Sequence, residues 1–171
     1  MPELPEVETI KNELQPHIIG HRITGVTLFW EGLVRQPSVE EFCTRLIGQR
    51  LTEVARRGKY LIFSLTSGKA LIIHLKMTGS LLLKSALAEP DKFIRAILHL
   101  DGETQLRFRD PRKLGVMWLV EDTSSIIGKL GPEPLEADFT PQILAQRLSD
   151  RTAPIKALLC DQGFIAGIGN M

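Results

Sequence analysis

The chain has 171 residues, of which 43% are hydrophobic and 24% are charged. This composition is typical of a folded globular protein and excludes a disordered tail. The 21 basic and 20 acidic residues leave a net charge of +1, which by itself does not indicate a nucleic-acid ligand. Cys43 and Cys160 lie far apart without a CxxC pair, so we expect neither a disulfide framework nor a zinc site. No apolar run approaches a membrane span and no basic-then-apolar signal opens the chain, which predicts a cytoplasmic protein without membrane contact.

Basic residues are concentrated in two stretches. Residues 51–80 hold five basic side chains and one acidic one, and residues 107–113 hold four basic and one acidic. Acidic residues gather in 3–13, 31–41 and 121–138. Segregation of this kind can give a near-neutral protein one basic face. A solvated surface with random clustering is the other interpretation of charge alone.

The first segment predicts a helix, because apolar residues recur at spacings of three and four over residues 4–14 and share one face. Pro5 is compatible with the first turn of this helix, and Pro16 predicts its end. A second, short helix is expected over residues 39–46, after Ser38 as a capping residue.

Strands dominate the chain from His21 onward. Asp101 and Gly102 predict a hairpin turn between two of them. We therefore expect a mainly β fold with flanking helices, a two-layer sandwich or flattened barrel of about eight strands. The expected strands, rich in β-branched or aromatic residues, cover residues 22–30, 50–56, 60–65, 70–76, 80–83, 93–100, 105–109 and 116–120.

A Gly- and Pro-rich segment at residues 130–135 marks a change of character. We place a β domain over 1–135 and a helical domain over 136–171, with helices expected at 140–148 and 155–161. The chain stops in a Gly-rich turn, which normally leads into another element, so we expect the helical domain to be incomplete in this chain.

The N-terminus carries a candidate nucleophile. If Met1 is removed, Pro2 becomes a secondary amine, and α-amino groups have pKa values of about 7.7–8.0 against about 10.4 for lysine. Such an amine attacks a carbonyl or a sugar C1′ and forms a cationic iminium that promotes β-elimination. Glu3 and Glu6 share a face beside it, although the helix dipole favours their ionised forms, so Glu3 could act as an acid only if burial raised its pKa. The alternative is that Pro and Glu merely begin a helix well.

Other candidates are not specific when taken singly. Lys59, in a turn between strands, could reach a phosphate or donate a proton, and His74 ends a strand. Met77 precedes a Gly turn and could form a wedge between base pairs. Arg112 and Leu114 alternate in a basic loop and could project together. Each is equally typical of an ordinary core or surface position.

Taken together, these segments are specific. The chain holds, in order, PELPEVET at 2–9, RGKYL at 57–61, HLKMTGSL at 74–81, DPRK at 110–113, LGPEPL at 130–135 and AGIGN at 166–170. This series resembles formamidopyrimidine-DNA glycosylase, the bacterial repair enzyme for oxidised purines, over essentially the whole chain. The resemblance implies base-excision repair by a bifunctional glycosylase and abasic-site lyase that acts through an N-terminal proline Schiff base.

By the same resemblance, four residues form the catalytic set. Pro2 attacks C1′ of the flipped nucleotide, Glu3 donates a proton, and Lys59 serves β-elimination and holds a phosphate, while Glu6 supports the site. Base flipping costs a few kcal/mol, which side chains that fill the gap offset.

The implied DNA-binding residues include three that fill this gap, Met77, Arg112 and Leu114. Leu114 stands where the family usually has an aromatic residue, and Phe93 stands where it commonly has a phosphate-contacting histidine, with Arg95 as a substitute. The remaining implied DNA contacts are His74, Arg151, Lys156 and Asn170.

The implied partner is double-stranded DNA with oxidised bases or abasic sites, bound by a monomer associated with the bacterial nucleoid. The family continues into a zinc finger after the position of Met171, so we expect no cofactor or metal in this chain and zinc in a full-length protein. The fragment alone is then expected to bind DNA weakly and to have little activity.

Two other functions stay open at this stage. One is a glycosylase for oxidised pyrimidines of the endonuclease VIII group, whose members usually have Gly where Leu4 stands. The other is a non-catalytic module for binding damaged DNA, in which a retained Met1 blocks the amine.

Overall fold

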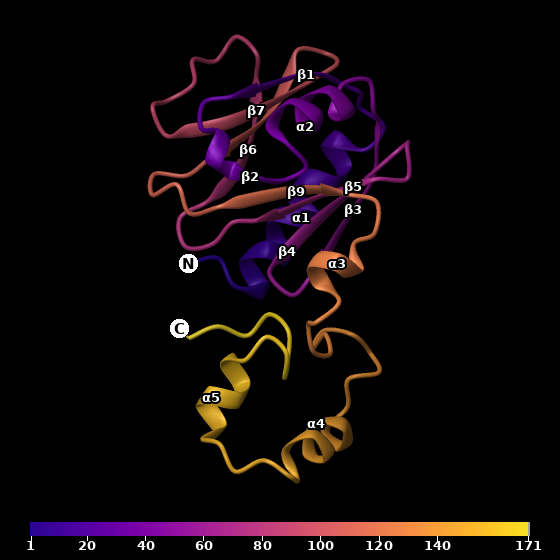
Figure 1. The fold of residues 1–171 in the computed structure, drawn as a ribbon, viewed down its shortest axis with the longest axis vertical. Coiled ribbons are helices and arrows are strands. Elements are labelled where there is room, and N and C mark those ends of the chain that lie inside the picture. The colour runs from indigo at the N-terminus through magenta and orange to yellow at the C-terminus, as the bar shows by residue number, and fades with distance from the viewer. Residues whose placement is uncertain (171) are drawn as a thin grey trace.

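Two antiparallel-rich sheets form the larger part of the protein, which we describe from a computed structural model covering residues 1–170 (Figure 1). The four-stranded sheet has the order β1-β7-β8-β6 and the five-stranded sheet the order β2-β9-β5-β4-β3. The mainly β sandwich predicted from the sequence is confirmed. The strands are β1 (Ile23–Leu28), β2 (Val34–Gln36), β3 (Leu51–Arg57), β4 (Tyr60–Leu65), β5 (Ala70–His74), β6 (Ser80–Ser85), β7 (Ile94–Leu100), β8 (Thr104–Arg109) and β9 (Val116–Val120).

The main core lies between the two sheets. Strand β4 alternates half-buried and buried residues along its length, as expected when one face of a strand packs inward. Phe42, Phe63 and Phe108 are fully buried in this core. Helix α1 (Leu4–Ile18) packs on β3 and β4, and α2 (Val39–Leu46) packs on β1 and β2.

Helix α1 does not end at Pro16 as predicted but continues to Ile18. A proline inside a helix removes one backbone hydrogen bond and crowds the preceding turn. The extra turn buries Ile18 completely in the main core. Burial of an isoleucine side chain stabilises by about 1.5–3 kcal/mol, which offsets much of this cost.

Three short elements were not predicted, the first of them the 3₁₀ helix η1 (Glu31–Leu33). Strand β2 has only three residues, and it pairs with β9 in parallel. It therefore has neither the length nor the neighbouring hairpin turn by which a strand is recognised in a sequence. Helix α3 (Ser124–Ile127) has four residues and buries none of them. The predicted Asp101-Gly102 hairpin is confirmed, because β7 and β8 pair in antiparallel on either side of it.

A small helical part follows the sandwich. Helices α4 (Pro141–Leu148) and α5 (Ile155–Cys160) lie where the sequence predicts them, and Thr140 caps α4 by accepting from the Ile143 N–H at 3.3 Å. A separate core with buried Leu158 and Phe164 holds this part together. Figure 1 shows it below the sandwich, on the side where α1 begins. Within residues 1–170, no helix is long and apolar enough to cross a membrane.

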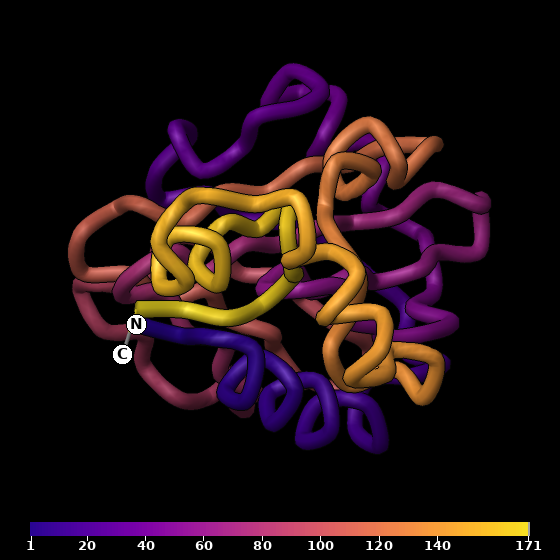
Figure 2. The backbone as a smooth tube through the Cα atoms, turned by 90° about the horizontal axis from the view of Figure 1, so that it is seen from below, coloured from indigo at the N-terminus to yellow at the C-terminus, as the bar shows by residue number. Residues whose placement is uncertain are grey.

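The two parts meet through backbone hydrogen bonds. The N–H of Ala166 donates to the carbonyl of Pro132 at 3.0 Å, and the N–H of Leu4 donates to the carbonyl of Gly167 at 3.2 Å. Figure 2 shows the result: the indigo N-terminal segment and the yellow end of the chain lie side by side. Residues from the two ends of the sequence therefore share one place in the fold.

Candidate active site

The start of α1 is fixed by its own acidic residues. Glu3 is the residue before the helix, and its backbone N–H donates to Oε2 of Glu6 at 2.9 Å in a capping box. Backbone N–H groups of Glu6 and Glu3 hold the pKa of the Glu6 carboxyl below its usual value. Glu6 therefore stays ionised and fixes the backbone that leads to Pro2.

The Glu3 carboxyl lies against the end of the helical part. A Cβ placed on Gly169 would come within 2.0 Å of Glu3 Cδ, so a larger residue there would displace the Glu3 carboxyl. Two residues earlier, Gly167 has φ +93° and would press any Cβ into the Leu4 side chain at 2.5 Å. The structure thus brings Glu3 and the segment that ends in Asn170 together.

Lys59 lies in the turn between β3 and β4, which contacts the same segment. Gly58 in this turn has φ +57°, and a Cβ there would lie 3.4 Å from Ala166 and 3.6 Å from the Gly167 nitrogen. Since Gly167 contacts Leu4 on its other side, one short segment links the Lys59 turn with the N-terminus. Glu3, Leu4 and the turn that holds Lys59 therefore all lie against the segment that ends in Asn170.

His74 ends β5 beside the Lys59 turn. Its Nδ1 accepts from the Lys76 N–H at 3.0 Å, which places the ring proton on Nε2, and Tyr60 packs edge-on to it at 4.6 Å between ring centroids. Burial, followed by the positive charges of Lys76 and Lys59, lowers the pKa of His74 to about 4. His74 is therefore a neutral hydrogen-bond donor near two lysines at neutral pH.

Met77, Arg112 and Leu114 occupy two adjacent loops, the first between β5 and β6 and the others between β8 and β9. Met77 is 46% exposed and Leu114 36% exposed. Arg112 Nη1 lies 3.6 Å from Met77 Sδ, so the two loops touch at their tips. The structure brings the three predicted gap-filling side chains to one place on the surface.

A buried aspartate beneath these loops escaped the sequence analysis, which counted Asp110 only as a charge. It is fully buried and accepts from the N–H groups of Leu114 at 2.7 Å and Gly115 at 2.8 Å, and from the Thr78 hydroxyl. Burial alone would raise the pKa of Asp110, but the Thr78 hydroxyl and these backbone N–H groups outweigh it and hold the pKa low. One carboxylate thus fixes both loops.

Arg95 supports the same loop from its other side. Its guanidinium donates to the carbonyls of Asp110 at 2.7 Å and of Pro111 and Lys92, each at 3.3 Å. These contacts make Arg95 a support for the loop, in addition to the phosphate contact predicted for it. Phe93 lies between two cations, 5.1 Å from Lys92 and 4.9 Å from Arg109, measured to the ring centroid.

The other predicted DNA contacts lie on the helical part. Lys156 and Asn170 are exposed and line one shallow apolar cavity of about 400 Å³ beside α5. Arg151 is exposed, with its guanidinium carbon 5.8 Å from the Phe164 ring centroid. The structure brings Lys156 and Asn170 together and places Arg151 after α4.

Several of the basic residues that cluster in the sequence are buried or paired with acidic residues. Arg107 is buried and donates to Gln105 and to backbone carbonyls, and Arg109 pairs with Asp91 at 2.7 Å. Arg56 and Arg57 pair with acidic residues at the junction of the two parts. Counting basic residues along the sequence therefore overestimates the number of unpaired positive charges. Their acidic and carbonyl partners lie mostly far away in the sequence and cannot be recognised from it.

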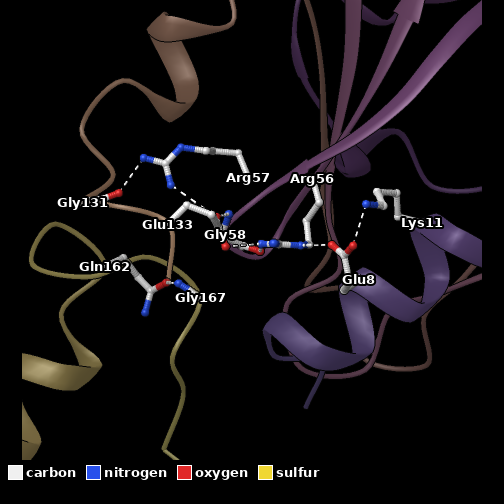
Figure 3. A network of polar contacts seen from close by, with 9 residues as sticks. All are labelled: Glu8, Lys11, Arg56, Arg57, Gly58, Gly131, Glu133, Gln162 and Gly167. Atoms are coloured by element: carbon white, nitrogen blue, oxygen red, sulfur yellow. Dashed lines mark hydrogen bonds and ion pairs between the residues drawn. The ribbon is translucent and has the colours of Figure 1, made fainter. Parts of the chain in front are cut away.

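At this junction, a second carboxylate was missed. Glu133, in the Gly- and Pro-rich segment, is 6% exposed and contacts Arg56, Arg57 and Gly58 (Figure 3). An acidic residue between two prolines does not by itself suggest burial. Among residues 1–170, no group of three or more His, Cys, Asp or Glu is placed to hold a metal ion.

Comparison with known families defines the class of this protein. A family model described as formamidopyrimidine-DNA glycosylase N-terminal domain matches residues 1–117. A second model, the H2TH domain of the same enzymes, matches residues 130–171. The chain belongs to the formamidopyrimidine-DNA glycosylase family.

Curated relatives support this assignment over the full chain. The formamidopyrimidine-DNA glycosylase of Protochlamydia amoebophila is 42% identical over 172 residues, and that of Chloroflexus aurantiacus is 44% identical over 174 residues. Each alignment covers 100% of this chain and 62% of the relative. The chain thus spans less than two thirds of the length of these relatives.

Solved structures show the same fold. The Lactococcus lactis enzyme bound non-covalently to DNA with an abasic site superposes with a TM-score of 0.89 at 33% identity, covering 99% of this chain and 66% of that one. A variant of that enzyme in complex with DNA containing Fapy-dG superposes with a TM-score of 0.91 at 34% identity, covering 99% and 63%.

Proposed function

We propose that this chain is the catalytic part of a bifunctional DNA glycosylase and abasic-site lyase that removes oxidised purines from double-stranded DNA. The observation that carries the proposal is the assembly of the N-terminus, Glu3, Lys59 and Asn170 around one short segment. The relatives bound to abasic-site and Fapy-dG DNA support the substrate class.

The proposed chemistry begins at Pro2, once Met1 has been removed. The neutral secondary amine attacks C1′ of the flipped nucleotide, and the bond from C1′ to the base breaks with its electron pair leaving on the base. Glu3, held against Gly169, is placed to supply a proton. Opening of the sugar leaves a cationic iminium between Pro2 and C1′.

Lys59 and His74 are proposed to act on the phosphates and the elimination. The iminium makes a C2′ proton acidic, and its loss expels the 3′ phosphate by β-elimination. Lys59 carries the positive charge suited to the departing phosphate, and neutral His74 offers its Nε2–H as a donor beside it. Met77, Arg112 and Leu114 fill the gap left by the flipped nucleotide.

Borohydride trapping tests the proposal. In the full-length protein with Met1 removed, reduction on an abasic-site duplex should give a covalent complex, and Pro2→Gly should slow its formation. Glu3→Gln should slow excision of 8-oxoguanine by roughly tenfold or more and leave DNA binding intact. Glu13→Gln, on an exposed position of the same helix, is the matched control.

Two outcomes would decide against this function. Full activity of both site variants would refute the assigned roles. A retained Met1 together with DNA binding and no trapping would support the non-catalytic binding module instead, and N-terminal mass analysis identifies that case.

The proposal extends to the remaining predicted properties. We infer a monomer in the bacterial cytoplasm, associated with the nucleoid through its DNA partner, and zinc in a full-length protein. We also expect the 171-residue chain alone to bind DNA more weakly than its relatives, because it spans 62% of their length.

A further inference from the structure

Glu133 is a buried carboxylate shared by three basic or polar groups from one hairpin. Its Oε2 accepts from the Gly58 N–H at 2.8 Å and lies 3.3 Å from Arg57 Nη1, while its Oε1 lies 2.8 Å from Arg56 Nη1. The Gly58 contact is direct, so the carboxylate holds the backbone immediately before Lys59. The carboxylate therefore fixes the backbone position from which the Lys59 side chain extends.

Arg56 continues the network to α1. Its side chain is 5% exposed, and its Nε lies 2.5 Å from Oε2 of Glu8, which also pairs with Lys11 at 2.6 Å (Figure 3). Glu8 lies in the helix that begins directly after Pro2 and Glu3. The guanidinium of Arg56 therefore couples the orientation of α1 to the Lys59 turn.

The network also reaches the helical part. Arg57 Nη2 donates to the Gly131 carbonyl at 2.5 Å, and the Gly131 N–H donates to the Gln162 carbonyl at 2.8 Å. Gln162 in turn accepts from the Gly167 N–H at 2.9 Å and donates to the Ile168 carbonyl at 2.8 Å. The carboxylate of Glu133 is thus connected to the segment that ends in Asn170.

A buried ion network is weak evidence for stability, because desolvation offsets much of the attraction, but its directional contacts select one geometry. At this junction, apolar residues could join the two parts but could not fix three separate segments in a defined relation. We propose that Glu133 is a positioning residue that sets the Lys59 turn against α1 and the helical part. This inference rests on the proposed function, because Pro2 and Lys59 must then meet one substrate.

The test compares Glu133→Gln with Glu121→Gln in the full-length protein. Glu121 also pairs with a cation, Lys69, but at the surface with 82% of its side chain exposed, which makes it a matched control. Glu133→Gln should lower the single-turnover rate of borohydride trapping on an abasic-site duplex by roughly tenfold or more, since small misplacements of reacting groups are costly. Its affinity for a duplex with a tetrahydrofuran abasic analogue should remain unchanged.

A second variant guards against a simple folding defect. Gly58→Ala leaves Glu133 and both arginines in place but strains the turn at φ +57°. It should reproduce the loss of trapping rate, with unchanged affinity and a cooperative thermal transition. Amide hydrogen exchange at Gly58 should be slow in the wild type and faster in Glu133→Gln.

The outcomes separate the two levels of the proposal. If the wild type traps and Glu133→Gln and Gly58→Ala trap equally fast, the positioning role is overturned and the proposed function stands. Parallel loss of affinity and rate would also overturn it, because it indicates a structural role. A wild type that does not trap overturns the proposed function itself, and the positioning role with it.

Discussion

At the scale of single residues, Gly169 leaves the space that the Glu3 carboxyl occupies. A methyl group at position 169 would overlap the carboxyl carbon. A shift of the Glu3 side chain would relieve the clash, but it would move the carboxyl that takes part in the capping box at the start of α1. The glycine therefore belongs to the site although it has no reactive group.

Gly169→Ala should lower the rate of base excision by roughly tenfold or more, because it displaces the proposed proton donor. Gly25→Ala, where a Cβ would meet His99 at an ordinary 3.5 Å, is the control and should retain full activity. Single-turnover excision from an 8-oxoguanine duplex measures both. Equal rates for the two variants would show that the approach of Glu3 to Gly169 is not needed.

His74 gives the protein a pH dependence with a defined sign. Its folded-state pKa of about 4 lies below the usual 6.5, so protonation favours the unfolded chain. The stabilisation from neutral His74 is complete above pH 6.5 and is lost as the pH falls toward 4, by about 3 kcal/mol at most.

His74→Gln keeps a neutral acceptor for the Lys76 N–H and should flatten this dependence. Urea unfolding at several values between pH 7 and pH 4 gives the comparison, because carboxylates lose their contributions in both proteins alike. A wild-type curve parallel to that of the variant would mean that His74 titrates normally in the folded protein.

Sequence reasoning selected candidate residues by their type and place, such as Pro2 beside Glu3, and their roles stay predictions. It missed Asp110 and Glu133, because their roles depend on burial and on partners far along the chain. An aspartate in a basic loop and a glutamate between prolines have the local appearance of surface residues.

At the scale of elements, two loops act as one unit because they share a buried acceptor. Asp110 lies at the base of the β8–β9 loop, and Thr78 brings the β5–β6 loop to the same carboxylate. Gly115 and Gly79 leave space for Phe108 beneath them, since a Cβ at either position would approach its ring within 3.0 Å. The β5–β6 and β8–β9 loops therefore share a fixed base at Asp110 and have exposed tips.

Asp110→Asn should destabilise the protein by about 2–4 kcal/mol, because an amide group turned toward backbone N–H groups leaves buried donors unsatisfied. Asp91→Asn, which breaks a half-exposed pair with Arg109, should cost less than about 1 kcal/mol. Below its unfolding temperature, the Asp110 variant should also discriminate less between abasic-analogue and undamaged duplexes. If Asp110→Asn changed neither the free energy of unfolding nor the discrimination between the two duplexes, Asp110 would not be what holds the two loops together.

Strands and hairpins were predictable because alternation and Gly-containing turns are local signals. The parallel pairing of β2 with β9 was not, since three residues carry no period. The continuation of α1 past Pro16 was missed for another reason: the gain comes from burying Ile18 in a core that forms only in three dimensions.

At the scale of the whole molecule, Gly131 brings the backbones of the two parts into close contact. A Cβ there would lie 2.6 Å from the carbonyl group of Phe164, which belongs to the core of the helical part. The neighbouring hydrogen bonds, from Gly131 to Gln162 and from Ala166 to Pro132, depend on this fit.

Gly131→Ala should open the junction and uncouple the unfolding of the helical part from that of the sandwich. Scanning calorimetry should show one transition in the wild type and two in the variant, the helical part melting first. Gly163→Ala is the control, because its Cβ would lie 3.3 Å from Asp161 Oδ1 and at an ordinary 3.6 Å from the Lys129 carbonyl oxygen, so only a small shift of the Asp161 side chain is needed. A single transition in Gly131→Ala would show that the two parts unfold together without this contact.

The hydrogen bond between Leu4 and Gly167 joins residues from the two ends of the sequence. Contacts between distant residues close late in folding, and during synthesis they must wait for the second partner to leave the ribosome. A growing chain therefore carries its N-terminal amine unpositioned until nearly all of the segment described here has been made. The order of translation thus delays the positioning of the N-terminus until the Lys59 turn, the β5–β6 and β8–β9 loops and the junction around it have been made.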